Sequence, residues 1–458
     1  MGLRLFLNRI RIALFLCFAL ITAAEASELS TIRQLTKQFP QQDLAMLILE
    51  GKEEFFSLNG NKKLTPASVT KAITGAAVLE LLGPGYPFRT QLLYDGSILE
   101  NSIRGAIYLR GGGDPSFHSG RLSVLLDGLK KRNIQTIEGN LIIDDSRFDD
   151  VTTPDWQSRI PTLNEQLFPL YVRLDPVGEL HPIPSQQQKL QRVQRKLMNL
   201  EGRFVVYQNN IEPDLYTGEL FLQMLRKSKI ELKGEVRRGK VSKSSRVLSE
   251  IVTSSDTLVH KMMKSSNNYY ADLLVRNLAY EFGERPATFE TGIHFVKFYL
   301  DYAKIPRSLY SLNSGSGFSH QNKISPVALA ALLNHLKSEK SVFPYFQSSL
   351  PVAGVDGTLR GRMKNTPAQN RVRAKTGYLR PVSTKTLRFG GAVTLAGFAS
   401  HPNGKQYTFA FLYNGLASPD TVRRMFDNVC IVLTGGKPAI ATKSKKKPAK
   451  AIKRRAKK

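Results

Sequence analysis

Residues 65–84 read TPASVTKAITGAAVLELLGP, and this stretch decides the fold of the chain. Between Ser68 and Leu82 the segment is apolar on nearly every side, which predicts a helix buried in the core rather than one at the surface. Gly83-Pro84 ends the helix. Ser68 and Lys71 are one helical turn apart at its start, so both side chains lie on the same face.

A serine and a lysine at this spacing are suited to nucleophilic catalysis. A serine hydroxyl is a poor nucleophile unless its proton is removed, and a desolvated lysine with a lowered pKa can remove it. The amino terminus of the helix also points backbone N–H groups at the reacting centre. These residues alone leave a second interpretation open, in which Ser68 only caps the helix and Lys71 extends to the surface.

Strand-like runs lie on both sides of this helix. Asp43–Glu50 and Glu53–Leu58 are joined by a short turn, and Thr394–Ser400 and Tyr407–Asn414 flank a Pro-Asn-Gly turn. Each pair predicts a β-hairpin. Helical patterns cover Thr257–Phe282, Pro326–Lys337 and Pro419–Leu433.

The segment 89–249 has a different composition, with short strand-like runs separated by Gly, Pro and Asp turns. Strands and helices therefore occur at both ends of the chain, around a turn-rich middle. The sequence predicts one α/β domain, formed by residues 27–88 and 250–436, that is interrupted by a β-rich inserted region.

A second motif with polar side chains falls within the first of these helical patterns. Ser266 and Asn268 are two residues apart, and a turn at this point would aim both into a cleft. There Ser266 can relay a proton, and Asn268 can hold Lys71 and a substrate carbonyl. Polar residues at a solvated helix end, or the neighbouring frame Ser265-Ser266-Asn267, remain alternatives.

A third motif, Lys375-Thr376-Gly377, reads as part of a strand. On an exposed strand edge Lys375 and Thr376 can bind a terminal carboxylate, and Gly377 lacks the side chain that would block a substrate. The backbone N–H of Tyr378 can join that of Ser68 as an oxyanion hole. Taken alone, this motif is also typical of an ordinary basic strand.

The order of the three motifs, S-x-x-K, S-x-N and K-T-G, resembles that of the serine penicillin-recognising enzymes. The surrounding segments narrow the resemblance to the D-alanyl-D-alanine carboxypeptidase/endopeptidases of the penicillin-binding protein 4 type, the class C low-molecular-mass penicillin-binding proteins. The resembling segments are PASVTK (66–71), LRGGGDP (109–115), IDDSRFD (143–149), SNNYYAD (266–272), GSG (315–317), LPVAGVDGTLRGRM (350–363) and VRAKTG (372–377).

The resemblance implies a fold, an activity and a set of site residues. The fold is an antiparallel sheet flanked by helices. The activity is that of a serine DD-peptidase, which cuts D-Ala–D-Ala ends or D-alanyl crosslinks of peptidoglycan through an acyl-enzyme, needs no cofactor or metal, and is acylated by β-lactams. The implied catalytic residues are Ser68, Lys71, Ser266 and Asn268, and the implied substrate-binding residues are Lys375, Thr376, Gly377 and Tyr378.

The chain departs from the family pattern at three places, because Asn267 and Ser314 stand where Asp is usual and the segment Tyr378–Val393 is longer. Two alternative functions stay open: a serine β-lactamase, which must also deacylate β-lactams quickly, and a non-catalytic protein that binds the cell wall or a polyanion. The long insertion disfavours the first, and the complete motif set disfavours the second. The preference between carboxypeptidase and endopeptidase activity is left open, as are the preferred crosslink and the oligomeric state.

The start of the chain predicts export. Three arginines precede an apolar run from Ile12 to Ala24, and Ala24-Glu25-Ala26 has the form of a cleavage site, so residues 1–26 are interpreted as a signal peptide, with an uncleaved anchor as the alternative. The protein is then periplasmic or otherwise extracytoplasmic. Cys17 lies in this run, which leaves Cys430 alone in the mature chain and excludes an internal disulfide. The seven histidines show no metal-binding spacing.

The other end of the chain carries eleven of the positive charges behind the net charge of +29, and the rest of the chain is basic as well. Residues 437–458 hold eleven lysines and arginines and no acid, a density of like charge that predicts a disordered tail. For an exported protein the available polyanions are an anionic membrane or an envelope polymer, which makes nucleic acid an improbable partner. A tail that only increases solubility is the alternative.

Overall fold

The computed structural model describes residues 25–148, 213–283, 285–383 and 388–438. Its main sheet has five strands in the order β14-β17-β18-β1-β2, and all neighbours are antiparallel. Both predicted hairpins are confirmed, and the pair β1–β18 joins strands from the two ends of the chain. The strands are β1 (Leu44–Glu50), β2 (Glu53–Leu58), β14 (Val372–Leu379), β17 (Gly391–Ser400) and β18 (Gln406–Gly415).

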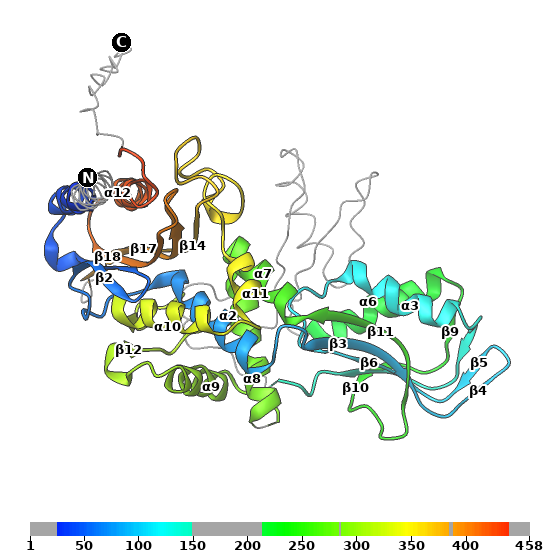
Figure 1. Cartoon of the computed structure of the whole chain (residues 1–458). Coiled ribbons are helices and arrows are strands. Elements are labelled where there is room, and N and C mark those ends of the chain that lie inside the picture. Colours follow the sequence, from blue (N-terminus) through cyan, green and yellow to red (C-terminus); the bar gives the residue numbers. More distant parts are fainter. Residues whose placement is uncertain (1–24, 149–212, 284, 384–387, 439–458) are drawn as a thin grey trace, which may run out of the picture.

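Helices cover both faces of this sheet (Figure 1). One face packs on α2 (Thr70–Leu81) and α10 (Pro326–Ser338), and the other packs on the helix at residues 25–37 and on α12 (Pro419–Val432). Helix α2 is buried from Thr70 to Leu79, as its apolar sequence predicts. The predicted architecture, an antiparallel sheet flanked by helices, is therefore confirmed.

The inserted region forms a second sheet at the opposite end of the molecule (Figure 1). Its order is β10-β8-β6-β3-β11, with β6, β8 and β10 parallel to one another. These strands are β3 (Pro87–Tyr94), β6 (Ile107–Arg110), β8 (Leu141–Asp144), β10 (Val236–Arg238) and β11 (Arg246–Ser254). A smaller sheet contains β4 (Ser97–Leu99), β5 (Ser102–Arg104), β7 (Thr136–Ile137) and β9 (Glu231–Leu232).

Two helices that the turn-rich composition did not predict also belong to this region. They are α3 (Leu122–Lys130) and α6 (Pro213–Lys227), and their apolar side chains share one hydrophobic core with the second sheet. The region is thus α/β as well as rich in strands. Its two ends are joined, because β3 and β11 pair along their length and Pro87 lies opposite Ser254. We propose domain borders at these two strands, within which the predicted borders at 88 and 250 fall.

The helical pattern predicted as one segment, Thr257–Phe282, consists of two helices. These are α7 (Ser255–Ser265) and α8 (Asn268–Phe282). Ser266 has a left-handed backbone, with φ of 55°, which ends α7, and the side chain of Asn267 caps α8 by accepting a hydrogen bond from the N–H of Tyr270 at 3.3 Å. The break lies between Ser266, which ends α7, and Asn268, which begins α8. A single helix would have placed both residues in one turn.

None of the helices in the described ranges is long and apolar enough to cross a membrane. Most of the predicted signal peptide and most of the basic tail lie outside the described residues. The remaining elements are α9 (Phe289–Tyr302), α11 (Phe343–Ser349), β12 (Tyr310–Ser311), β13 (Lys323–Ile324), β15 (Val382–Ser383), β16 (Arg388–Phe389), η1 (Gln41–Asp43), η2 (Ala67–Val69), η3 (Ser119–Arg121), η5 (Arg307–Leu309) and η6 (Gly357–Leu359).

Candidate active site

Ser68 and Lys71 meet at the start of α2, as their spacing predicts. Ser68 lies in the turn η2, and the Lys71 ammonium, which is fully buried, donates to Ser68 Oγ at 3.0 Å. It also donates to Asn268 Oδ1 at 2.6 Å and to the carbonyl of Ser316 at 2.5 Å. Burial lowers the pKa of Lys71 to about 7, against the opposing charge of Asp272. At neutral pH a large share of Lys71 is therefore unprotonated and able to accept a proton.

The second motif reaches this lysine through the break between α7 and α8. Asn268 is the first residue of α8 and faces Lys71, whereas Ser266 faces the third motif and accepts a hydrogen bond from Lys375 Nζ at 2.7 Å. Ser265 is exposed and its hydroxyl donates to the carbonyl of Lys261 within its own helix. Ser266 and Asn268 therefore contact Lys375 and Lys71, whereas the hydroxyl of Ser265, in the neighbouring frame, bonds within its own helix.

Lys375 lies on an edge strand, but its side chain is not exposed, and this corrects the sequence interpretation. Its side chain is fully buried, and Nζ donates to Ser266 and to the carbonyl of Thr376 at 2.8 Å. Burial and the nearby charge of Lys71 hold the pKa of Lys375 well below its usual value. Position 375 of β14 points back toward α7, and Thr376 presents its hydroxyl to the outside, bonded to that of Thr358 at 2.7 Å.

Gly377 allows β14 to pass directly beside the backbone of the serine turn. A Cβ atom at this position would lie 2.8 Å from the carbonyl oxygen of Pro66 and 3.1 Å from the N–H nitrogen of Ser68, and closer still to the Thr394 hydroxyl. Any larger residue would push the strand away from Ser68. The next residue, Tyr378, is half-exposed, with its ring under the guanidinium of Arg423.

Sequence reasoning missed three residues that complete the site: Asp272, Ser316 and Thr358. Asp272 is one helical turn after Asn268 on α8, and its carboxylate accepts the N–H of Ser316 at 3.2 Å. The spacing of four from Asn268 is the signal that could have identified Asp272. Ser316 belongs to the Gly-Ser-Gly segment, which turns next to Ala67, so its carbonyl reaches Lys71.

Ser314, one of the departures from the family pattern, still supports this turn. Its hydroxyl accepts the N–H of Gly317 at 3.2 Å and lies 3.1 Å from the hydroxyl of Ser316. A hydroxyl acceptor thus fills the place where Asp is usual. The longer segment after the third motif includes β15 and β16, and residues 384–387 between them lie outside the described part of the chain.

Together the site combines a serine, two buried lysines, an amide and a second serine, which come from η2, α2, α8, β14 and the break between α7 and α8. Within the described residues no group of three or more His, Cys, Asp or Glu side chains could hold a metal ion. The cluster has the components of acyl transfer to serine: a nucleophile, an adjacent base of lowered pKa, and N–H groups at a helix start.

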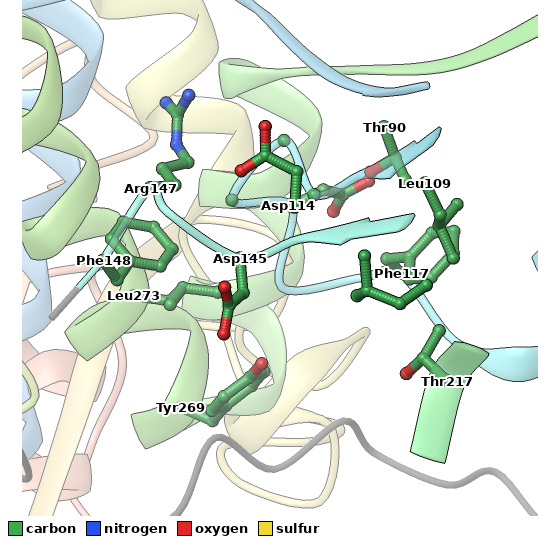
Figure 2. Close-up of a pocket in the computed structure, with 15 residues that line it drawn as sticks. Thr90, Leu109, Asp114, Phe117, Asp145, Arg147, Phe148, Thr217, Tyr269 and Leu273 are labelled. Carbon is green, nitrogen blue, oxygen red and sulfur yellow. The ribbon is translucent and has the colours of Figure 1, made fainter. Parts of the chain in front are cut away.

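A pocket with a volume of about 100 Å³ lies where the ends of β6 and β8 meet α8 (Figure 2). Tyr269, which follows Asn268, lines the pocket, and its hydroxyl points toward the carboxylate of Asp145 (Figure 2). The walls are largely apolar, with Leu109 and Phe117 on the insertion side. The inserted region therefore supplies most of the lining of this pocket, and α8 supplies Tyr269 and Leu273.

The chain is similar in sequence to known D-alanyl-D-alanine carboxypeptidases. The model of the D-Ala-D-Ala carboxypeptidase 3 (S13) family matches residues 29–160 and 192–433. The D-alanyl-D-alanine carboxypeptidase DacB of Haemophilus influenzae is 28% identical over 408 residues, which are 79% of this chain and 83% of that protein. A D-alanyl-D-alanine carboxypeptidase of an Actinomadura species is 28% identical over 427 residues, 80% of this chain and 76% of that protein.

Solved structures agree on the fold. The crystal structure of penicillin-binding protein 4 from Haemophilus influenzae matches with a TM-score of 0.66 and 23% identity, over 86% of this chain and 97% of that chain. A predatory peptidoglycan endopeptidase from Bdellovibrio bacteriovorus matches with a TM-score of 0.52 and 18% identity, over 86% of this chain and 94% of that chain. At identities of 23% and 18%, these two matches show a shared fold and nothing further.

Proposed function

The chain belongs to the D-Ala-D-Ala carboxypeptidase 3 (S13) family, and from that premise we propose that it is a serine DD-peptidase with Ser68 as its nucleophile. Its substrates are the D-Ala–D-Ala ends and D-alanyl crosslinks of peptidoglycan peptides. The observation that carries this proposal is the hydrogen bond of 3.0 Å between Ser68 Oγ and the buried Nζ of Lys71, whose pKa is about 7. A serine with such a base is activated near neutral pH.

The reaction proceeds through an acyl-enzyme. The carboxylate of the last D-alanine docks at the Thr376 hydroxyl, with the buried Nζ atom of Lys375 behind it. Ser68 attacks the preceding carbonyl while its proton passes to Lys71, and the N–H groups of Ser68 and Tyr378 stabilise the oxyanion. Ser266 relays the proton to the departing amine, Asn268 holds Lys71 through its Oδ1 atom, and water then hydrolyses the ester and restores Ser68.

The family assignment also supports covalent reaction with β-lactams, because their strained amide presents a carbonyl and a carboxylate in the same relation as the D-alanyl peptide. Fast hydrolysis of β-lactams, the activity of a β-lactamase, is the competing function. The long inserted region and the family match favour the peptidase. A non-catalytic scaffold is disfavoured by the intact set of Ser68, Lys71, Ser266, Asn268 and Lys375.

Two regional assignments belong to the same proposal. Residues 1–26 direct export, so the enzyme acts outside the cytoplasm, where its substrate lies. Residues 437–458 bind an anionic membrane surface or envelope polymer through their eleven cations. The family match and the composition of the two segments support these assignments.

Intact-mass analysis after incubation with benzylpenicillin tests the nucleophile. We expect an increase by the mass of one benzylpenicillin, mapped by peptide digestion to Ser68, and turnover of a D-Ala–D-Ala peptide. Ser68→Ala should lose both, with peptide turnover reduced by more than about a thousandfold. The control Ser265→Ala, which removes an exposed hydroxyl at the end of α7, should retain both.

Each contrary result would point to a different function or mechanism. Rapid consumption of benzylpenicillin without a lasting adduct would indicate a β-lactamase. An unmodified protein with the β-lactam unconsumed would indicate a binding protein on a catalytic scaffold. Equal turnover by Ser68→Ala would remove Ser68 from the mechanism.

A further inference from the structure

The turn at η6 places a second hydroxyl against the third motif. Thr358 Oγ1 lies 2.7 Å from Thr376 Oγ1, and Thr358 is exposed. The following residue, Leu359, is fully buried, so it anchors the turn in the core while Thr358 faces outward. Two hydroxyls thus stand side by side at the place where the substrate carboxylate docks.

A side-chain brace fixes this turn. The carboxylate of Asp356 accepts hydrogen bonds from Lys264 Nζ at 2.7 Å and from the N–H of Val352 at 2.9 Å. Lys264 also donates to the carbonyl of Leu350 at 2.7 Å. Since Lys264 lies in the last turn of α7, two residues before Ser266, the brace ties the turn to the second motif as well.

The backbone before the turn follows the outer edge of β14. Val352 bridges to Arg373, and the N–H of Ala374 donates to the carbonyl of Pro351 at 3.0 Å. These contacts cover β14 as far as Ala374, directly before Lys375 and Thr376. The chain then turns at Gly357, which has a φ of 55°, and returns to the strand through the side chain of Thr358.

The chemistry of paired hydroxyls gives Thr358 a role. A hydroxyl carries one proton and two acceptor lone pairs, so in a pair one hydroxyl donates and the other accepts. When Thr358 donates to Thr376, the proton of Thr376 is free to point toward an incoming anion. The ammonium of Lys375 is buried and bonded to Ser266 and to the Thr376 carbonyl, so it does not set this direction.

We propose that Thr358 is a positioning residue that aims the Thr376 hydroxyl at the carboxylate of the last D-alanine, and that it thereby sets the preference for substrates with a free carboxylate end. This inference rests on the proposed peptidase function and makes it more specific. Thr358 forms no bond with the reacting atoms, so it acts on substrate binding rather than on acylation.

The test uses two peptides that differ only at the last residue, D-alanine or D-alaninamide. We expect Thr358→Val to lower kcat/KM for the carboxylate peptide roughly tenfold, through KM, and to leave that for the amide unchanged. Thr358→Ser, which keeps a hydroxyl, should restore the preference. The control Thr366→Val removes a hydroxyl of the same segment that donates to the carbonyl of Met363 and should affect neither peptide.

Other outcomes separate the inference from the proposed function. Equal losses on both peptides, or a lowered melting temperature shared with Thr358→Ser, would make Thr358 structural only. An unchanged KM in Thr358→Val, or a wild-type enzyme without preference for the carboxylate, would overturn the proposal. Failure of the peptidase function itself would appear in the wild-type protein, as the absence of both turnover and an acyl adduct.

Discussion

At the scale of single residues, the site contains two buried lysines, Lys71 and Lys375, whose charges affect each other. Desolvation lowers the pKa of Lys71 to about 7, and the negative charge of Asp272 limits this decrease. Lys375 has its pKa lowered by burial and further by the charge of Lys71. Protonating both lysines at once is therefore unfavourable.

The pH dependence of acylation follows from this arrangement. The rate of acylation by benzylpenicillin should rise with pH through about 7, since Lys71 must be neutral to accept the Ser68 proton. Asp272→Asn removes the charge that raises the pKa of Lys71, so the midpoint should move to lower pH. Stopped-flow acylation across a pH series measures it.

Asp356→Asn serves as the matched control for this experiment. Asp356 pairs with Lys264 at 2.7 Å outside the Lys71 cluster, so its substitution should leave the midpoint in place. A midpoint that rises in Asp272→Asn, or that moves equally in both variants, would contradict the assignment of Lys71 as the base.

Local spacing and long-range contact explain which of these residues could be predicted. Ser68 and Lys71 are separated by one turn of one helix, so their proximity follows from sequence spacing alone. Ser316 and Thr358 reach the site only through tertiary packing, and neither belongs to a pattern that periodicity detects. The burial of Lys375 could not be predicted from the sequence either, because an edge strand usually exposes its side chains to solvent.

At the scale of elements, the break between α7 and α8 positions the second motif. The apolar spacing continues through both helices, and the break occurs at serine and asparagine rather than at glycine, so the pattern predicts one helix. Asn267 has an extended backbone and caps α8 with its side chain. Asp and Asn are comparable caps, which explains why Asn267 can stand where Asp is usual.

Removal of this cap has a measurable cost. Asn267→Ala should lower the free energy of unfolding by about 1 kcal/mol, because the first turn of α8 loses its side-chain acceptor. Asn267→Asp keeps the acceptor and should retain both stability and activity. Chemical denaturation of the three proteins compares them, and a fully stable Asn267→Ala would show that the cap contributes nothing to α8.

Helices α3 and α6 illustrate a different limit of the sequence pattern. The buried leucines of α3 are Leu122, Leu125, Leu126 and Leu129, a spacing that is helical. The many Gly, Pro and Asp turns around this segment favoured strands instead. The hairpins β1–β2 and β17–β18 were predicted correctly because each carries its own turn between two apolar runs.

At the scale of the whole molecule, the tail at residues 437–458 differs from the rest of the chain in its density of positive charge, with eleven cations and no acid. We expect removal of residues 437–458 to weaken binding to vesicles that contain anionic lipid, while cleavage of a soluble peptide stays unchanged. The difference should shrink as salt is added, because screening reduces the attraction of exposed cations. Cosedimentation with anionic and with neutral vesicles measures it, and a salt-independent or absent difference would reject the tail as a binding segment.

The pairing of β1 with β18 has a consequence for how the chain acquires its structure. Leu44 lies opposite Tyr413, so the main sheet cannot close until nearly the whole chain has been synthesised. The inserted region closes through the pair of Pro87 and Ser254 and can form earlier. Pairings between such distant segments are slow to form, because a long loop must be closed before any contact is gained. The main sheet, which contains β14 of the site, is therefore complete only after strands from the two ends of the chain have met.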